Sequence, residues 1–251
     1  MKKRYVRQRT TTRDEDSYVR QMVRLFKKTP IPDDEILFNL GLYLPSRILA
    51  RILLMDHLFR LALPLHGEVL EFGTRWGQNF SLFASLRGIY EPFNRHRKVV
   101  AFDTFEGLSG VRGEDGRSSF MRDGSLAVST GYEQHLEKLM DLKEKLDPLS
   151  HFKKYEIRKG PAEVSLAKYF EEHPESIVSL AFFDMDVYQP TRDCLAIIRD
   201  HLTKGSVVAF DELNEPEAPG ETIALEEVFG LSRYSIRRYQ YAARVAYLVV
   251  D

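Results

Sequence analysis

The 251 residues of this chain suffice for one sizeable α/β domain with a hydrophobic core. The 36 Lys and Arg residues nearly balance the 37 Asp and Glu residues, and the net charge of −1 predicts no nucleic-acid and no membrane partner. Because no apolar segment follows the basic N-terminus, we expect no signal peptide. The one cysteine, Cys194, excludes an internal disulfide, which favours a cytoplasmic location, and we expect it to pack in the core.

Charge is unevenly distributed at the N-terminus, where residues 1–30 carry ten Lys and Arg against three acids. Pro30 and Pro32 then break the chain, so we predict a basic N-terminal extension over residues 1–35 and one domain over residues 36–251. The extension is either a surface helix with disordered parts or an arm that packs on a partner subunit or covers the substrate.

A helical stretch is expected over residues 33–65, with a turn near residues 44–46, where Ser46 is a suitable cap for the long helix that follows. Strand patterns then alternate with helical patterns, and the strands are expected at residues 68–72, 98–102, 155–160, 178–184 and 206–212. The last two strand patterns, 234–240 and 244–250, are too close together for a crossover and predict an antiparallel hairpin. This order predicts an α/β fold with a Rossmann-like doubly wound seven-stranded sheet, made of five parallel strands plus a C-terminal antiparallel hairpin. It is the layout of class I S-adenosylmethionine (SAM) methyltransferases.

The end of the first strand carries Glu71, Gly73 and Gly77, spaced acid-x-Gly-x-x-x-Gly at a strand-to-helix turn. The two glycines allow the backbone to approach a ligand and the next helix to start tightly. Asp103 ends the second strand, where a carboxylate can accept hydrogen bonds from both ribose hydroxyls of an adenosine. Each feature alone also fits an ordinary turn or cap, but the two in this order favour a SAM site. The predicted cofactor-binding residues are Glu71, Phe72, Gly73, Thr74, Gly77, Asp103, Thr104, Phe105 and Gly160.

Acidic residues end the fourth and fifth strands: Asp184, and the pair Asp211 and Glu212. The carboxyl ends of neighbouring parallel strands lie about 5 Å apart, so the three carboxylates should converge. Such a set suits a hard cation, Mg²⁺ with Ca²⁺ or Mn²⁺ as alternatives, and a neighbouring carboxylate could take the proton of an acceptor hydroxyl. The alternative is a purely structural role, in which these acids cap a helix or lie in loops. We expect Asp186 to shape the turn rather than to bind the metal directly.

Four stretches resemble the successive signatures of the macrocin O-methyltransferase (TylF-type) family: "GEVLEFGTRWG", "VVAFDTFEGL", "FFDMDVYQPT" and "GSVVAFDE". The resemblance runs from about residue 35 to residue 230. It implies a SAM- and Mg²⁺-dependent O-methyltransferase that acts on a hydroxyl of a small molecule, a sugar of a natural product or glycoconjugate, and that forms a homo-oligomer. It also implies that Asp184, Asp211 and Glu212 bind the metal and that Asp184 activates the acceptor hydroxyl. The chain departs from the family in having Glu212 where a second aspartate is usual, and Gln78 and Asn79 where a further glycine tends to stand.

The segment 109–130 is long and polar, and the resemblance implies that it is a lid over the substrate. Its arginines, Arg112, Arg117 and Arg122, are possible acceptor contacts, and a mobile surface loop is the alternative. Two other functions remain open: a metal-dependent nucleotide-sugar glycosyltransferase that uses Asp184-x-Asp186, and a SAM-fold binding protein without catalytic activity. The glycosyltransferase accounts for the acids but not for the glycine turn with Asp103.

Overall fold

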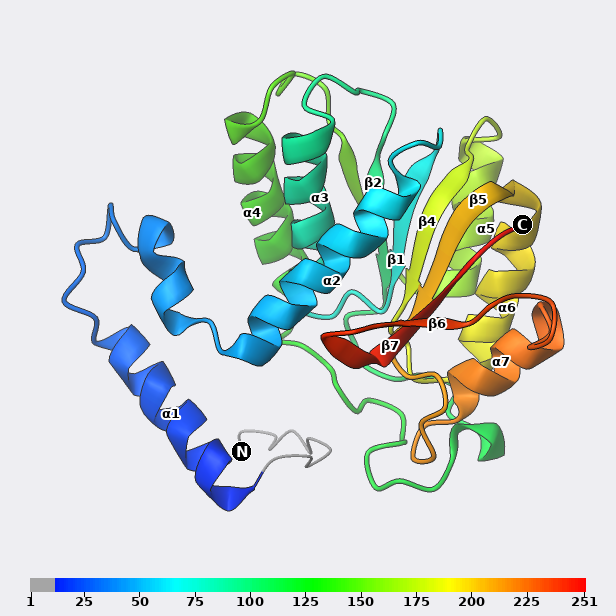
Figure 1. Cartoon of the computed structure of the whole chain (residues 1–251), viewed down its shortest axis with the longest axis horizontal. Coiled ribbons are helices and arrows are strands. Elements are labelled where there is room, and N and C mark those ends of the chain that lie inside the picture. The colour runs from blue at the N-terminus through cyan, green and yellow to red at the C-terminus, as the bar shows by residue number, and fades with distance from the viewer. Residues whose placement is uncertain (1–11) are drawn as a thin grey trace.

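The computed structural model describes residues 12–251, which form a central sheet with helices on both faces (Figure 1). The strands are β1 (Glu68–Phe72), β2 (Val99–Asp103), β3 (Tyr155–Lys159), β4 (Val178–Phe183), β5 (Leu202–Phe210), β6 (Arg237–Tyr239) and β7 (Ala242–Val249). Their order across the sheet is β3-β2-β1-β4-β5-β7-β6. Strands β1 to β5 are parallel, and β7 runs antiparallel to both β5 and β6. The predicted fold class, five parallel strands plus a C-terminal antiparallel hairpin, is confirmed.

Helices α2 (Ser46–Ala62), α3 (Gln78–Tyr90) and α4 (Tyr132–Leu146) cover one face of the sheet. Helices α5 (Ala162–Glu172), α6 (Tyr188–Ile198) and α7 (Gly220–Val228) cover the other. Along one strand the side chains alternate between the two cores: Val69 packs with Phe83 of α3, and Leu70 packs in the core that holds Leu166 of α5. Because both faces are covered, β1 and β4 are buried throughout, as the apolar sequences of parallel strands require. Cys194 is fully buried on α6, as predicted.

One expectation about the helices was wrong in detail. Residues 37–43 form a 3₁₀ helix, η1 (Leu37–Tyr43), and α2 begins at Ser46 after Pro45, so the Ser46 side chain does not cap that helix. Proline at this point ends one helical segment and fixes the backbone for the next. The apolar face of α4 is only partly buried, because Leu136 and Met140 face the core whereas Leu146 is 85% exposed.

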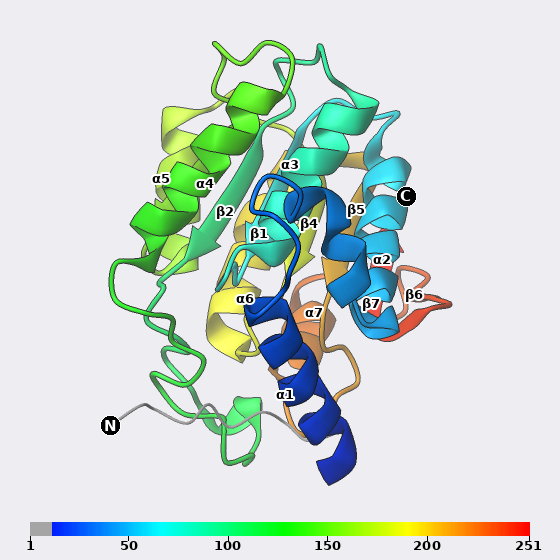
Figure 2. The ribbon, with the colours of Figure 1, turned by 90° about the vertical axis from the view of Figure 1, so that its left-hand side faces the viewer.

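The N-terminal segment stands apart from the sheet. Helix α1 (Arg13–Lys27) starts at the N-cap Thr12 with a capping box to Glu15, and a loop joins it to η1. Figures 1 and 2 show α1 beyond the carboxyl ends of the parallel strands, away from the helices that cover the sheet. No described side chain between residues 12 and 50 is buried. Among the described helices none alone has the length and apolar character to cross a membrane, although η1 and α2, bent by 119°, meet those criteria as a pair.

Candidate functional site

A cavity of about 550 Å³ opens at the carboxyl ends of β1, β2, β4 and β5. This is the edge at which ligands bind in open parallel sheets, where the strand order reverses between β1 and β4. Residues from α2 and from the loop after β2 complete its walls. The volume is in the range of small-molecule and cofactor sites.

The turn after β1 is built on two glycines with left-handed backbone conformations. Gly73 has φ = +85°, and a Cβ atom there would lie 1.9 Å from the carbonyl oxygen of Asp184 at the end of β4. Gly77 has φ = +77° as the N-cap of α3, and its Cβ atom would lie 2.6 Å from a methyl carbon of Leu136 on α4. Gly73 is therefore required by close packing against backbone as well as by the turn, whereas Gly77 is required by its backbone conformation, since the end of the Leu136 side chain could shift. Gly73 also lines the cavity.

The Asp103 carboxylate is held at the end of β2 by two backbone N–H groups. The Arg75 N–H donates to Oδ2 at 2.6 Å and the Phe105 N–H donates to Oδ1 at 2.5 Å. Burial raises the pKa of Asp103, and these hydrogen bonds oppose the rise. A carboxylate oxygen accepts more than one hydrogen bond, so Asp103 can still accept from a ligand while it orders both turns.

Glu71 lies beneath the glycine turn and is 1% exposed. Burial raises its pKa to about 7, although Thr74, Asn79 and Arg51 lie close enough to oppose the rise. Among residues 12–251, its Oε2 atom has no hydrogen-bond partner.

The cavity brings together five of the nine predicted cofactor residues. Its walls include Gly73, Thr74, Asp103, Thr104 and Phe105. In the part of the chain that the structure describes, Glu71, Phe72, Gly77 and Gly160 are not in its walls. The walls include instead Ala162 and Glu163, which lie just beyond Gly160. The positions of these residues along the cavity fit SAM. A ribose bound at Asp103 would place the methionine end of SAM over the glycine turn and the end of β4.

The two acidic strand ends do converge, and an arginine lies between them. Nη2 of Arg51 on α2 donates to Oδ2 of Asp184 at 3.0 Å, and Nη1 donates to Oδ1 of Asp211. Nε of Arg51 donates to Oδ1 of Asn79 at 3.0 Å, and the guanidinium lies 5.5 Å from the centre of the Phe182 ring. Burial and the nearby Asp211 raise the pKa of Asp184 well above its usual value, and Arg51 opposes that rise.

Glu212 lines the same cavity but has a different partner, since its Oε1 forms an ion pair with Arg244 of β7. Behind it lies Glu221 at the start of α7, which is fully buried. Its Oε1 accepts hydrogen bonds from the backbone N–H groups of Met185 and Asp186, and its Oε2 accepts one from the N–H of Glu212. Glu221 thus ties the loop after β4 to the loop after β5.

Asp186 has φ = +62° and is 6% exposed, so it forms the sharp turn after β4 and lines the cavity. Burial raises its pKa to about 6, with Asp211 adding to the rise and Arg244 opposing it. Its supporting role relative to Asp184 stays a prediction. Among the described residues no histidine lines the cavity, whereas Asp184, Asp186 and Asp211 do.

Sequence reasoning missed three residues of this cluster, Arg51, Arg244 and Glu221. Arg51 is one of three arginines in α2, with Arg47 and Arg60, so its sequence position does not mark it as the one that faces the cluster. Arg244 and Glu221 carried no signal either, because the first lies in a terminal hairpin and the second in a run of acids that is typical of a solvated surface.

The donor set suits a hard divalent cation: the three predicted ligands Asp184, Asp211 and Glu212 all line one cavity, and the two aspartates already accept hydrogen bonds from a single cationic group. Within residues 12–251, however, no three His, Cys, Asp or Glu side chains are arranged around one point as metal ligands. The reason is visible in the ion pairs, since Arg51 separates Asp184 from Asp211 and Arg244 draws Glu212 aside. The three carboxylates are therefore chemically suitable ligands for the ion. The ion can bind them only when Arg51 and Arg244 move away from them.

The loop between β2 and α4 closes one side of the cavity through Phe120, Leu126 and Val128. It is anchored by Asp115 of η2 (Gly113–Asp115), which is fully buried and accepts a hydrogen bond from the Tyr188 N–H at the start of α6. The three arginines expected to contact an acceptor are exposed and lie outside the cavity wall, and Arg112 donates to Gln189 instead at 2.8 Å.

No protein-family model matches the chain, and no curated protein does. Among solved structures, the crystal structure of CalS11, a calicheamicin methyltransferase, has a TM-score of 0.93 and 36% identity over 98% of this chain and 95% of that one. An apo structure of CalS11, which is described as a TDP-rhamnose 3′-O-methyltransferase, has a TM-score of 0.85 and 34% identity over 98% of this chain and 96% of that one. The O-methyltransferase NovP, at 17% identity and a TM-score of 0.56, shares the fold.

The fold and the strand-end site thus define a class I SAM-dependent O-methyltransferase. The chain belongs to the macrocin O-methyltransferase (TylF-type) family of these enzymes, of which CalS11 is also a member. SAM is its cofactor. The glycosyltransferase and the non-catalytic alternatives are therefore set aside.

Proposed function

We propose that this enzyme methylates a hydroxyl group of a nucleotide-activated sugar, with Asp184 as the general base. The observation that carries the proposal is that one cavity holds both Asp103, which suits the SAM ribose, and the Asp184 carboxylate. CalS11 is named as a TDP-rhamnose 3′-O-methyltransferase. In this chain Arg47 and Trp76 also line the cavity, and a guanidinium and an indole ring suit a diphosphate and a nucleobase.

The reaction needs one proton acceptor and an open path to the methyl group. Asp184 accepts the proton of the acceptor hydroxyl as its carboxylate lines the cavity at the end of β4. The hydroxyl oxygen forms a bond to the methyl carbon of SAM as the carbon–sulfur bond breaks, with its electron pair going to sulfur. The products are a methyl ether and S-adenosylhomocysteine, and the loop 109–130 excludes water from the cavity as the proposed lid.

We propose further that Mg²⁺ is held by Asp184, Asp211 and Glu212. When bound, Mg²⁺ supplies positive charge that lowers the pKa of an acceptor hydroxyl. The carboxylate donors and their position in the cavity support this assignment.

An acceptor panel tests the proposed function. We expect the enzyme to transfer an isotopically labelled methyl group from SAM to TDP-rhamnose, faster than to rhamnose alone, with loss of the product in EDTA and its return with Mg²⁺. Product mass and the fragment that carries the label are read by mass spectrometry. Methylation of free rhamnose but not of the nucleotide sugar would contradict the acceptor class, and full activity in EDTA would contradict the metal.

Replacing Asp103 with Ala should weaken S-adenosylhomocysteine binding by about 10- to 100-fold, because two hydrogen bonds from ribose hydroxyls to a charged group are lost. Titration calorimetry measures the affinity. The matched control is Glu106→Ala, three residues further along the same loop and exposed, which should leave the affinity unchanged. An Asp103→Ala variant that melts like the wild type and binds within twofold of it would remove Asp103 from the cofactor site.

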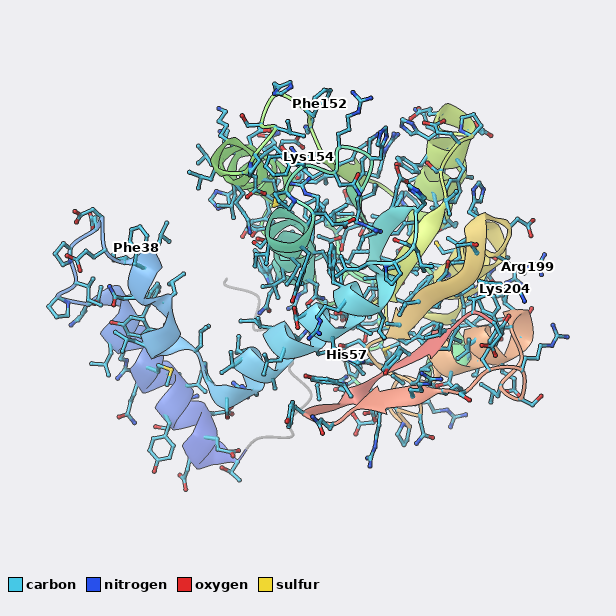
Figure 3. All side chains as sticks on the ribbon, turned by 45° about the horizontal axis from the view of Figure 1, so that its top comes forward. Phe38, His57, Phe152, Lys154, Arg199 and Lys204 are labelled. Atoms are coloured by element: carbon cyan, nitrogen blue, oxygen red, sulfur yellow. The ribbon has the colours of Figure 1, made fainter. Side chains whose placement is uncertain are left out.

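We also propose that the N-terminal extension and the adjoining η1 pack on a second copy of the chain, which makes the enzyme a homo-oligomer. Large apolar side chains of α1 and η1 are exposed, among them Leu25 at 68%, Phe38 at 89% and Leu42 at 69%. Figure 3 shows Phe38 on the outlying segment, apart from the sheet. Burying such side chains against another subunit would stabilise the segment by roughly 1.5–3 kcal/mol each.

The double variant Leu25→Asp/Phe38→Asp is expected to shift the protein to monomer in light scattering coupled to size-exclusion chromatography. Phe93→Asp is the control, since Phe93 is 75% exposed but lies between α3 and β2. A wild type that is monomeric at all concentrations would contradict the proposal.

We also propose a cytoplasmic location, because the one cysteine, Cys194, is a free and buried thiol.

A further inference from the structure

Arg51 holds the centre of the carboxylate cluster, and each of its three guanidinium nitrogens donates a hydrogen bond there. Nε faces Asn79, Nη1 faces Asp211 and Nη2 faces Asp184. The three partners come from α3, from the loop after β5 and from the loop after β4. A planar guanidinium fixed on three sides in this way has one defined position, unlike the side chain of a surface arginine.

The two carboxylates that Arg51 bridges are the same ones that the proposed magnesium site requires. A divalent cation would have to bind oxygens of Asp184 and Asp211 at a little over 2 Å, which leaves no space for a guanidinium between them. Positive charge from either source relieves the repulsion between these acids. The cluster therefore offers one place to two different cations.

We propose that Arg51 and the divalent cation are alternative occupants of this place, so that the metal binds only as the guanidinium withdraws. The inference rests on the magnesium site proposed above. Arg51 would act as a built-in substitute cation that keeps Asp184 and Asp211 together when no metal is bound and that lowers the apparent affinity for the metal. It is a positioning residue and takes no part in the bond-making step.

The structure provides a path for the exchange. The Arg51 side chain lines the open cavity and is 24% exposed, and Asp184 is 28% exposed beside it. The flexible aliphatic stem of Arg51 allows its guanidinium to swing into the cavity while α2 keeps its position. Arg47, one turn earlier on α2, also lines the cavity but forms no ion pair with these carboxylates, so it serves as a matched control.

Binding of Mn²⁺, followed by the electron paramagnetic resonance signal of the free ion, tests this exchange without measuring activity. Arg51→Ala is expected to bind Mn²⁺ about tenfold or more tightly than the wild type, because the competitor is gone and the carboxylates are left uncompensated. Arg47→Ala should bind as the wild type does. In EDTA the Arg51→Ala variant should melt at a lower temperature than the wild type. Saturating Mn²⁺ should raise the melting temperature of the variant by more than it raises that of the wild type.

The outcomes separate this inference from the magnesium proposal. If the wild type binds Mn²⁺ and Arg51→Ala binds it equally or more weakly, the exchange is wrong while the metal site stands. If neither protein binds Mn²⁺, the metal site fails and the exchange fails with it. Should Arg51→Ala not fold, Arg51→Gln keeps part of the aliphatic stem and an amide hydrogen-bond donor without the charge, and the same tenfold gain is expected of it.

Discussion

Replacing Asp184 with Asn is expected to slow methyl transfer by about 10²- to 10⁴-fold, because the amide cannot accept the proton of the acceptor hydroxyl. Binding of S-adenosylhomocysteine should stay within about threefold of the wild type, since the cofactor contacts predicted at Asp103 and the glycine turn are untouched. Single-turnover rates with a saturating acceptor measure the chemical step, and titration calorimetry measures the cofactor affinity.

The same variant also separates the two roles given to Asp184. If its only role is to bind the metal, excess Mg²⁺ should restore the rate, whereas loss of the base cannot be restored in this way. Asp200→Asn, at a position just after the C-terminal end of α6 whose side chain is 81% exposed, is the control. A rate within tenfold of the wild type would move the base to Asp186, whose pKa of about 6 makes it the next candidate.

Gly73→Ala should destabilise the protein by about 3 kcal/mol or more and abolish cofactor binding. The added methyl would lie 1.9 Å from the carbonyl oxygen of Asp184, and the backbone at φ = +85° disfavours any residue with a Cβ atom. The ends of β1 and β4 must then separate, which displaces the cofactor turn and the proposed base together. For a chain of this size the change corresponds to a fall in melting temperature of about 6 °C or more.

Gly110→Ala isolates the conformational part of that effect. Gly110 has φ = +71° but nothing lies within 4 Å of its Cβ position, so we expect a loss of only about 1 kcal/mol. Equal losses at Gly73 and Gly110 would show that the close approach to Asp184 is relieved at little cost.

The fold was predictable from the sequence because its strands are short apolar runs buried on both faces. The pattern at residues 68–72 coincides with β1, and the pattern at 178–184 differs from β4 by one residue. The pattern is less informative at the edge of the sheet, where β6 is a strand of three residues, Arg237–Tyr239, inside a predicted stretch of seven. An edge strand is partly solvated, and its polar residues carry no clear period.

The site was predictable where it depends on strand ends, since topology alone brings Asp103, Asp184 and Asp211 to one edge. It was not predictable where it depends on side chains that reach in from elsewhere. Arg51 reaches the cluster from a helix more than a hundred residues earlier in the sequence, and only packing shows which way its side chain turns. The same is true of Arg244, whose pairing with Glu212 decides where that carboxylate points.

The hydrogen bonds of Glu221 have a consequence for how the acidic loops behave. One side chain accepts from three backbone N–H groups, two after β4 and one after β5, so the two loops cannot be displaced independently. Together with the first turn of α7 the two loops form a single mechanical unit. This unit carries Asp184, the proposed base, and the other two proposed metal ligands, Asp211 and Glu212. Any lengthening of one loop during evolution or engineering would have to be matched in the other, or the distance between the base and its neighbouring acids would change.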